Sequence, residues 1–167
     1  MASTRCDAGW MRLLCLLGIL AFCAGCSSKG PRYPEDFARY QRIDAAVESL
    51  RKAYTGKDLL GIHALMLPLE RLERMEAEIT RDFEHFQEIS LDFSIDRIVI
   101  DGETIEVFVH WQGQWKRNPA DDGFRERGHG VLRWVGVKSI LLSNMDGDLP
   151  FGMATRHTEP SKEGSPG

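Results

Sequence analysis

The sequence predicts an α+β domain in which N-terminal helices pack on one face of an antiparallel sheet of about four strands. Two observations predict this class. Apolar residues recur every three or four positions up to residue 86, which is typical of helices buried on one side. Beyond residue 86 apolar and polar residues alternate, which is typical of half-buried strands. A run of helices followed by a run of strands favours an α+β layout.

Three helices account for the first half of this pattern. The first is expected to begin near Pro34 and to end near Gly56, and the second covers 57–67 and ends near Pro68. The third spans 69–86. The apolar stripe of the first helix contains Phe37, Tyr40, Ile43, Val47, Leu50 and Tyr54, and that of the third contains Leu69, Leu72, Met75, Ile79, Phe83 and Phe86. Each stripe indicates a helix packed on a core.

Four strands joined as a meander follow the helices. Their expected positions are 89–96, 104–115, 124–135 and 137–143. The pair Asp101-Gly102 predicts a tight hairpin turn between the first two strands. A loop is expected at 118–123, and a turn at 144–148 after the fourth strand.

Composition and motifs exclude several classes of function. The chain has 167 residues and a formal charge of −4, without the basic stripe that nucleic-acid binding needs. All four cysteines lie within the first 26 residues, so the body of the chain holds no disulfide or zinc site. Asn144, Asp146 and Asp148 have the spacing of a calcium loop, but Gly147 is misplaced and Thr155 stands where the loop needs glutamate. No nucleotide loop or nucleophile elbow is present, and no metal or cofactor is expected.

The N-terminus has the pattern of an export signal. Residues 13–24 are twelve in number and carry no charge, which is too short for a membrane span and typical of the apolar part of a signal peptide. Arg5 and Arg12 supply the positive charges that precede such a segment. Both Met1 and Met11 are possible starts of the chain.

The segment that follows, Cys23-Ala24-Gly25-Cys26-Ser27-Ser28, resembles the lipobox of bacterial lipoproteins. The resemblance implies that residues 1–25 are removed and that Cys26 carries the lipid, palmitate included, that anchors the protein to a membrane. Ser27 in place of aspartate resembles lipoproteins of the outer membrane, so the expected location is the cell envelope, facing the periplasm. A soluble exported protein cleaved by the general signal peptidase is the alternative. Residues 26–34 then form a tether, 35–153 the folded domain and 154–167 a disordered tail.

Three segments of the body carry a second resemblance. They are AYTGKDLLGIHALM at 53–66, VHWQGQW at 109–115 and GDLPFG at 147–152. In this order of elements they resemble the nuclear transport factor 2-like superfamily, which includes SnoaL and ketosteroid isomerase-like domains. The resemblance implies a cone-like, curved sheet wrapped around the helices. That superfamily includes isomerases, dehydratases, polyketide cyclases and binding adaptors, so the fold leaves the function open.

Polar residues of the two longest strands are the candidate functional residues. Alternation places Arg125, Arg127, His129 and Arg133 on one face of their strand, near Glu106, His110, Gln112 and Gln114 of the strand before it. If this face lines a pocket, His110 or His129 paired with Glu106, Asp92 or Asp96 can transfer a proton. The other interpretation is a solvated outer face.

Trp111 and Trp115 lie on the apolar face of their strand. They either pack against the helices or line the mouth of a cavity, with Arg127 as a further pocket candidate. The leading hypothesis is therefore a membrane-anchored periplasmic lipoprotein with a non-catalytic domain that binds an envelope protein or an apolar small molecule. The alternative is a small isomerase or dehydratase that acts on an apolar substrate by acid–base catalysis. A homodimer formed through the sheet, with Phe108 at the contact, is a third hypothesis.

Overall fold

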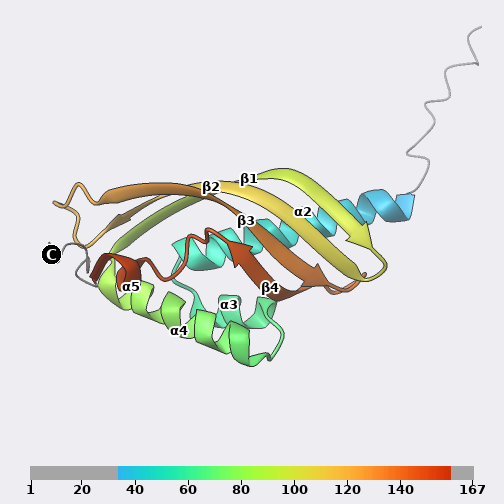
Figure 1. The fold of residues 1–167 in the computed structure, drawn as a ribbon, viewed down its shortest axis with the longest axis horizontal. Coiled ribbons are helices and arrows are strands. Elements are labelled where there is room, and N and C mark those ends of the chain that lie inside the picture. The colour runs from blue at the N-terminus through green and yellow to red at the C-terminus, as the bar shows by residue number, and fades with distance from the viewer. Residues whose placement is uncertain (1–33, 159–167) are drawn as a thin grey trace, which may run out of the picture. The chain divides into compact units, whose positions relative to one another are not determined.

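The computed structural model describes residues 34–158, and its helices and strands follow one another in the predicted order (Figure 1). The elements are α2 Pro34–Thr55, α3 Leu59–Leu65, α4 Glu70–His85, β1 Glu88–Asp101, β2 Thr104–Lys116, β3 Phe124–Val135, β4 Leu141–Gly147 and α5 Met153–Thr158. Residues 38–158 belong to one compact unit. The predicted signal peptide, Cys26 and the residues after 158 lie outside the described part of the chain.

The four strands form one antiparallel sheet in the order β1-β2-β3-β4. Figure 1 shows the strands curving over the helices, which lie on one face of the sheet. This arrangement confirms the predicted α+β class with a curved sheet. Within residues 34–158, none of the helices has the length and apolar character that a membrane crossing requires.

The β1–β2 hairpin sets the register of the two longest strands. Asp101 pairs with Thr104, and Gly102 has a φ of +57°, which glycine adopts without the steric strain of other residues. A bulge lies between Ile95 and Arg97, so that Asp96 is an extra residue with no partner on β2. Such a bulge bends the strand and increases its twist.

The fourth strand begins later than predicted. It covers Leu141–Gly147 where the sequence pattern predicted 137–143, and residues 144–147 are part of the strand where a turn was expected. Gly136 has a φ of +114°, and a Cβ there would lie 2.0 Å from the backbone oxygen of Ser139. The chain therefore turns at 136–139, and Val137 is exposed. The strand starts only where Leu141 can pair with Val135.

The C-terminal part of the domain is longer than predicted. Residues 154–158, which the sequence analysis assigned to the tail, belong to helix α5. The backbone N–H of Ala154 donates to Oδ1 of Asp82 at 2.7 Å, and that of Gly152 to Oδ2 at 2.8 Å. The start of α5 is thus bound to α4 by a side chain far away in sequence, which a local pattern does not reveal.

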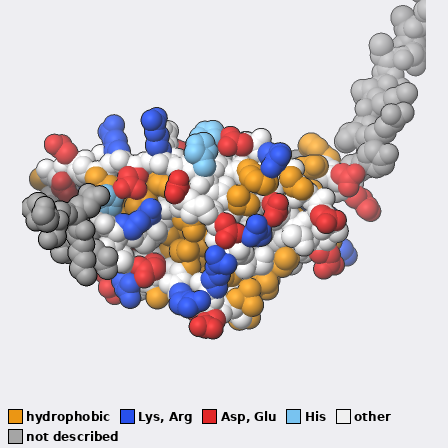
Figure 2. Space-filling model, viewed as in Figure 1, with side chains coloured by type: hydrophobic (Ala, Val, Ile, Leu, Met, Phe, Trp, Pro, Cys, Tyr) orange, Lys and Arg blue, Asp and Glu red, His pale blue; other side chains and the backbone are white. Residues whose placement is uncertain are grey.

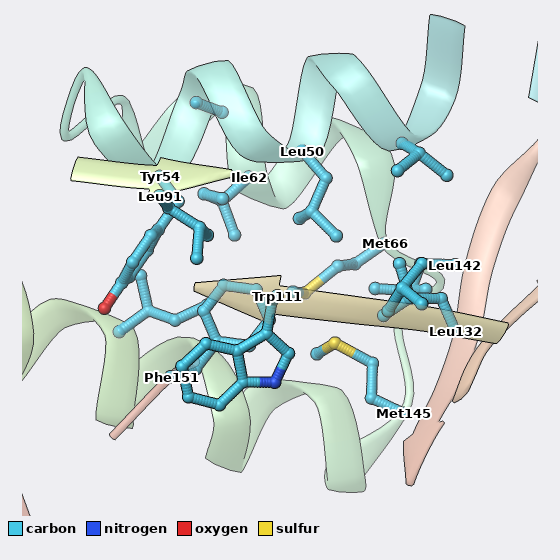
Figure 3. Close-up of a cluster of buried hydrophobic side chains, with 14 of the residues drawn as sticks. Leu50, Tyr54, Ile62, Met66, Leu91, Trp111, Leu132, Leu142, Met145 and Phe151 are labelled. Atoms are coloured by element: carbon cyan, nitrogen blue, oxygen red, sulfur yellow. The ribbon is translucent and has the colours of Figure 1, made fainter. Parts of the chain in front are cut away.

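The core lies between the sheet and the helices, and it combines aliphatic side chains with aromatic ones (Figure 3). The largest fully buried side chains include Trp111, Trp115, Trp134, Tyr54 and Phe86. Trp111 and Trp115 meet edge to face with ring centroids 6.1 Å apart, and Tyr54 and Phe151 do so at 4.8 Å. The predicted stripe of α2 is buried from Ile43 to Tyr54, whereas Tyr40 is exposed.

Candidate functional site

The outer face of the sheet, opposite the helices, collects most of the predicted functional residues. Strand pairing aligns their side chains in rows across β1, β2 and β3. The rows are Ser90–Gln114–Arg125, Asp92–Gln112–Arg127 and Ser94–His110–His129, with Glu106 opposite Arg133. The residues that were predicted to share a face of the sheet therefore do share one. This face is the solvated outer face and not the lining of a pocket.

His110 and Asp96 form a close pair on this face. Nδ1 of His110 lies 2.8 Å from Oδ1 of Asp96, and the ring centroids of His110 and His129 are 6.0 Å apart. The bulge at Asp96 brings the carboxylate to this position. The side chains of His110 and Asp96 are 49% and 48% exposed, so water reaches both groups. The pair can exchange a proton, but the site offers no shielding from solvent.

The two other candidate carboxylates have different surroundings. Glu106 accepts a hydrogen bond from Nε of Arg133 at 2.9 Å, and Arg133 also pairs with Asp146. The hydrogen bond to Glu106 raises the pKa of the Arg133 guanidinium. Glu106 is therefore engaged in an ion pair, whereas Asp92 is exposed opposite Gln112. Neither carboxylate approaches a histidine through a contact in the described structure.

Shallow depressions run along the outer face beside β2 and β3. One, of about 430 Å³, is lined by Asp92, Gln112, Arg125 and Arg127 among others. A second, also about 430 Å³, contains His110, His129 and Arg127. Both open to solvent, and they share Gln112 and Arg127. Most of the lining residues are polar or charged, and both depressions are open, so this surface can bind through hydrogen bonds and charge but does not enclose an apolar molecule.

Trp111 and Trp115 are core residues in this structure. Trp111 is 2% exposed and its Nε1 donates to the backbone oxygen of Asp148 at 2.8 Å, although its ring also borders the second depression. Trp115 is fully buried, and its Nε1 donates to the hydroxyl of Tyr54 at 3.0 Å. Of the two interpretations given above, packing against the helices is the one that the structure shows.

Comparison with known proteins bears on the fold. No protein-family model matches the sequence, and no curated protein sequence matches it. Among solved structures, a nuclear transport factor 2-like superfamily protein of Salmonella enterica matches 77% of this chain and 99% of its own, with 11% identity and a TM-score of 0.57. The chain has the nuclear transport factor 2-like fold.

Two further structures agree. An NTF-2 like protein of unknown function from Shewanella oneidensis matches 65% of this chain and 97% of its own, with 13% identity and a TM-score of 0.52. A conserved protein from Planctomyces limnophilus matches 67% and 99%, with 16% identity and a TM-score of 0.56. Identities this low concern the fold, and the function must come from the residues of this chain.

One end of this nuclear transport factor 2-like domain holds a buried polar network that the sequence analysis missed. Asp82 is 0% exposed, and besides the two backbone N–H groups it accepts a hydrogen bond from the Tyr54 hydroxyl at 2.8 Å. The sequence does hold a signal, because Asp82 stands in the apolar stripe of α4 between Ile79 and Phe86. Every oxygen of Asp82 has a partner, so the network is a structural one.

Burial shifts the pKa values of both acids in this network. It raises the pKa of the Asp82 carboxyl, although hydrogen bonds from Ala154, Tyr54 and Gly152 act in the opposite direction. Burial together with the nearby Asp82 carboxylate also raises the pKa of the Tyr54 phenol. Tyr54 therefore stays neutral at ordinary pH and keeps the proton that it donates.

The raised pKa of Asp82 predicts a pH effect on stability. Because the folded chain holds this proton more tightly than the unfolded chain, whose aspartates titrate near about 3.9, Asp82 contributes more stability below that pH and less as pH rises through its folded pKa. We expect the free energy of unfolding of the native protein, relative to Asp82→Asn, to fall over this range. Urea denaturation of both proteins at a series of pH values measures this difference.

Other acids are present in both proteins and cancel in the comparison. The hydrogen bond from Arg51 holds the pKa of Glu48 at about 2. The contribution of Glu48 to stability therefore falls as pH drops, which is opposite to the pH dependence expected of Asp82. A difference that is flat with pH, or that rises, would show that the Asp82 carboxyl is not raised.

Within residues 34–158, no group of three or more His, Cys, Asp or Glu side chains has a geometry that could hold a metal ion. The pair of His110 and Asp96 with the nearby His129 thus does not form such a group.

Proposed function

We propose that this chain is a lipid-anchored protein of the cell envelope whose nuclear transport factor 2-like domain binds a partner and does not catalyse a reaction. One observation carries the proposal for the domain. The candidate acid–base groups lie on the open outer face, while buried side chains such as Trp111, Trp115 and Tyr54 pack the space between sheet and helices. Catalytic proton transfer is favoured in sites that exclude water, and this one does not.

The packing also favours one class of partner. An apolar small molecule needs a largely enclosed apolar pocket. The depressions that the outer face carries are open and lined by polar side chains, among them Gln112, Arg125 and Arg127. An envelope protein is therefore the better supported partner.

The alternative function is acid–base catalysis of an isomerase or dehydratase kind. The 2.8 Å contact between His110 and Asp96 is the observation that favours it. The same pair is about half exposed, and the depression that contains His110 is open to solvent, with the edge of Trp111 at its border. Binding therefore takes precedence over catalysis in the proposal.

The membrane half of the proposal rests on residues 13–28. A charge-free segment that ends at a cysteine after small residues supports lipidation of Cys26. Several acyl chains on one residue hold a protein on a membrane stably, where a single chain does so only marginally. Ser27 supports the outer membrane, with the domain facing the periplasm.

Replacement of the lipid-bearing cysteine tests this half directly. We expect Cys26→Ser to remain uncleaved and to lose acylation, because the modified thiol is what cleavage requires in lipoproteins. Mass spectrometry of the N-terminal peptide and labelling with a palmitate analogue measure both changes. Cys23→Ser is the matched control and keeps cleavage and acylation. A Cys26→Ser protein that is still cleaved and still found in membranes would contradict the proposed lipid anchor.

A further inference from the structure

We infer that Arg125 and Arg127, together with Gln112 and Gln114, form a docking strip for an extended acidic segment of a partner protein. The inference deepens the proposed binding function of the domain and does not depend on the lipid anchor. The docking strip consists of these four residues on the outer face of β2 and β3.

The side chains of the two arginines are unpaired. Both are exposed, and neither forms a hydrogen bond or an ion pair with any residue from 34 to 158. Several other arginines bind carboxylates, as in the contacts of Arg51 with Glu48 at 2.7 Å and of Arg133 with Glu106 at 2.9 Å. Two free guanidinium groups on a chain of net charge −4 are available for an anion from outside.

Their spacing selects the shape of that anion. Arg125 and Arg127 are alternate residues of one strand, so their side chains leave the same face about 6.6 Å apart. An extended peptide repeats its own side chains at the same interval. Carboxylates at alternate positions of such a peptide can therefore bind both guanidinium groups at once. Each carboxylate accepts two parallel hydrogen bonds from one arginine.

The two glutamines complete the strip. Gln112 lies opposite Arg127 and Gln114 opposite Arg125, so each arginine has an amide beside it. Nε2 of Gln114 donates to the backbone oxygen of Asp122 at 2.8 Å, which fixes the orientation of this amide. Amides donate and accept hydrogen bonds, as a peptide backbone requires.

Charges around the strip exclude a continuous polyanion. Asp92 lies opposite Gln112 on β1, Glu126 lines the same depression, and Asp148 borders the neighbouring one. These carboxylates repel a chain with a charge on every unit, such as a nucleic acid, while two discrete carboxylates reach the arginines. Figure 2 shows basic side chains and a histidine standing on the sheet side of the molecule, at the top of the view.

A second copy of the chain is less suited to this surface. A two-fold contact through the same face places the arginines of both copies at one interface, where like charges oppose association. Phe108, the apolar residue expected at such a contact, lies under the guanidinium of Arg97, with Cζ 4.1 Å from the ring centroid. An acidic segment of a different protein brings carboxylates to the two arginines and no further guanidinium groups.

Peptide binding tests the inference. The probe is a short labelled peptide with glutamates at alternate positions, and its control has the same composition with the glutamates adjacent. Fluorescence anisotropy with the full-length protein in detergent measures the dissociation constant. We expect the alternating peptide to bind more tightly, and R125Q/R127Q to weaken its binding by about tenfold or more. Raised salt should weaken the binding as well.

A charge-matched variant separates the strip from net charge. Arg74→Gln with Lys138→Gln removes two positive charges from exposed positions outside the strip, and we expect it to change the affinity by less than about twofold. Equal losses in the two double variants would overturn the inference. So would equal binding of both peptides, tighter binding of heparin than of peptide, or a homodimer that R125Q/R127Q dissociates.

The outcome is independent of the anchor. A protein that lacks the lipid on Cys26 but binds the alternating peptide supports the docking strip and contradicts only the membrane half of the proposed function. A lipidated protein whose peptide binding is unaffected by R125Q/R127Q contradicts the strip and leaves the anchor intact. Unchanged thermal unfolding of the variants establishes that the loss belongs to the surface.

Discussion

Asp82→Ala is expected to lower the free energy of unfolding by about 2–4 kcal/mol, because buried donors lose the acceptor they share. The backbone N–H groups of Gly152 and Ala154 both donate to this carboxylate, and Tyr54 donates to it as well. The Tyr54 hydroxyl also lies 3.0 Å from the backbone oxygen of Pro150, which can accept its hydrogen bond in the variant. The larger part of the loss in stability therefore comes from the N–H groups of Gly152 and Ala154, which are left without this acceptor. Unfolding of the variant should begin at helix α5.

Urea denaturation followed by tryptophan fluorescence measures this loss, because Trp111, Trp115 and Trp134 are buried in the folded domain. Glu84→Ala is the matched control. Glu84 is an exposed acid on the same helix, and its replacement should change stability by less than about 0.5 kcal/mol. If the two variants unfold at the same urea concentration, the network around Asp82 does not hold α5 on α4.

The elements that could be predicted from the sequence are those whose pattern comes from burial on one side. The stripe from Ile43 to Tyr54 and the alternation in 104–115 are imposed by a core on one face, so they mark α2 and β2 well. Strand ends have no such constraint. Val137 is apolar and begins the predicted fourth strand, yet it is exposed in a turn that depends on the backbone at Gly136.

The site was predictable only in part, for two physical reasons. Alternation showed that Arg127 and His129 share a face, but a polar face lining a pocket and one in water have the same pattern. Contacts that depend on an irregular backbone, or on a segment distant in sequence, could not be predicted from the sequence pattern. Asp96 meets His110 through a bulge, and Asp82 is buried because α5 folds over it. A local periodicity contains neither fact.

Trp115→Ala is expected to have the largest effect, a loss of about 3–5 kcal/mol, because it empties a large volume in the core. Trp115 is 0% exposed, and its ring stacks on that of Phe124 with centroids 5.5 Å apart. The variant also removes the N–H that donates to the Tyr54 hydroxyl at 3.0 Å. Trp115→Phe keeps much of the volume and loses this hydrogen bond, so a smaller loss of about 1–2 kcal/mol is expected in urea denaturation.

Phe108→Ala makes this prediction a test of which face of the sheet meets water. Phe108 is an aromatic residue of the same strand on the opposite face, and its partner there is the exposed Arg97, so its removal should cost about 1 kcal/mol. A loss for Phe108→Ala as large as that for Trp115→Ala would mean that the outer face is covered in solution. The proposal of a solvent-open binding surface requires the opposite order, because the residues of the docking strip lie on the same face as Phe108.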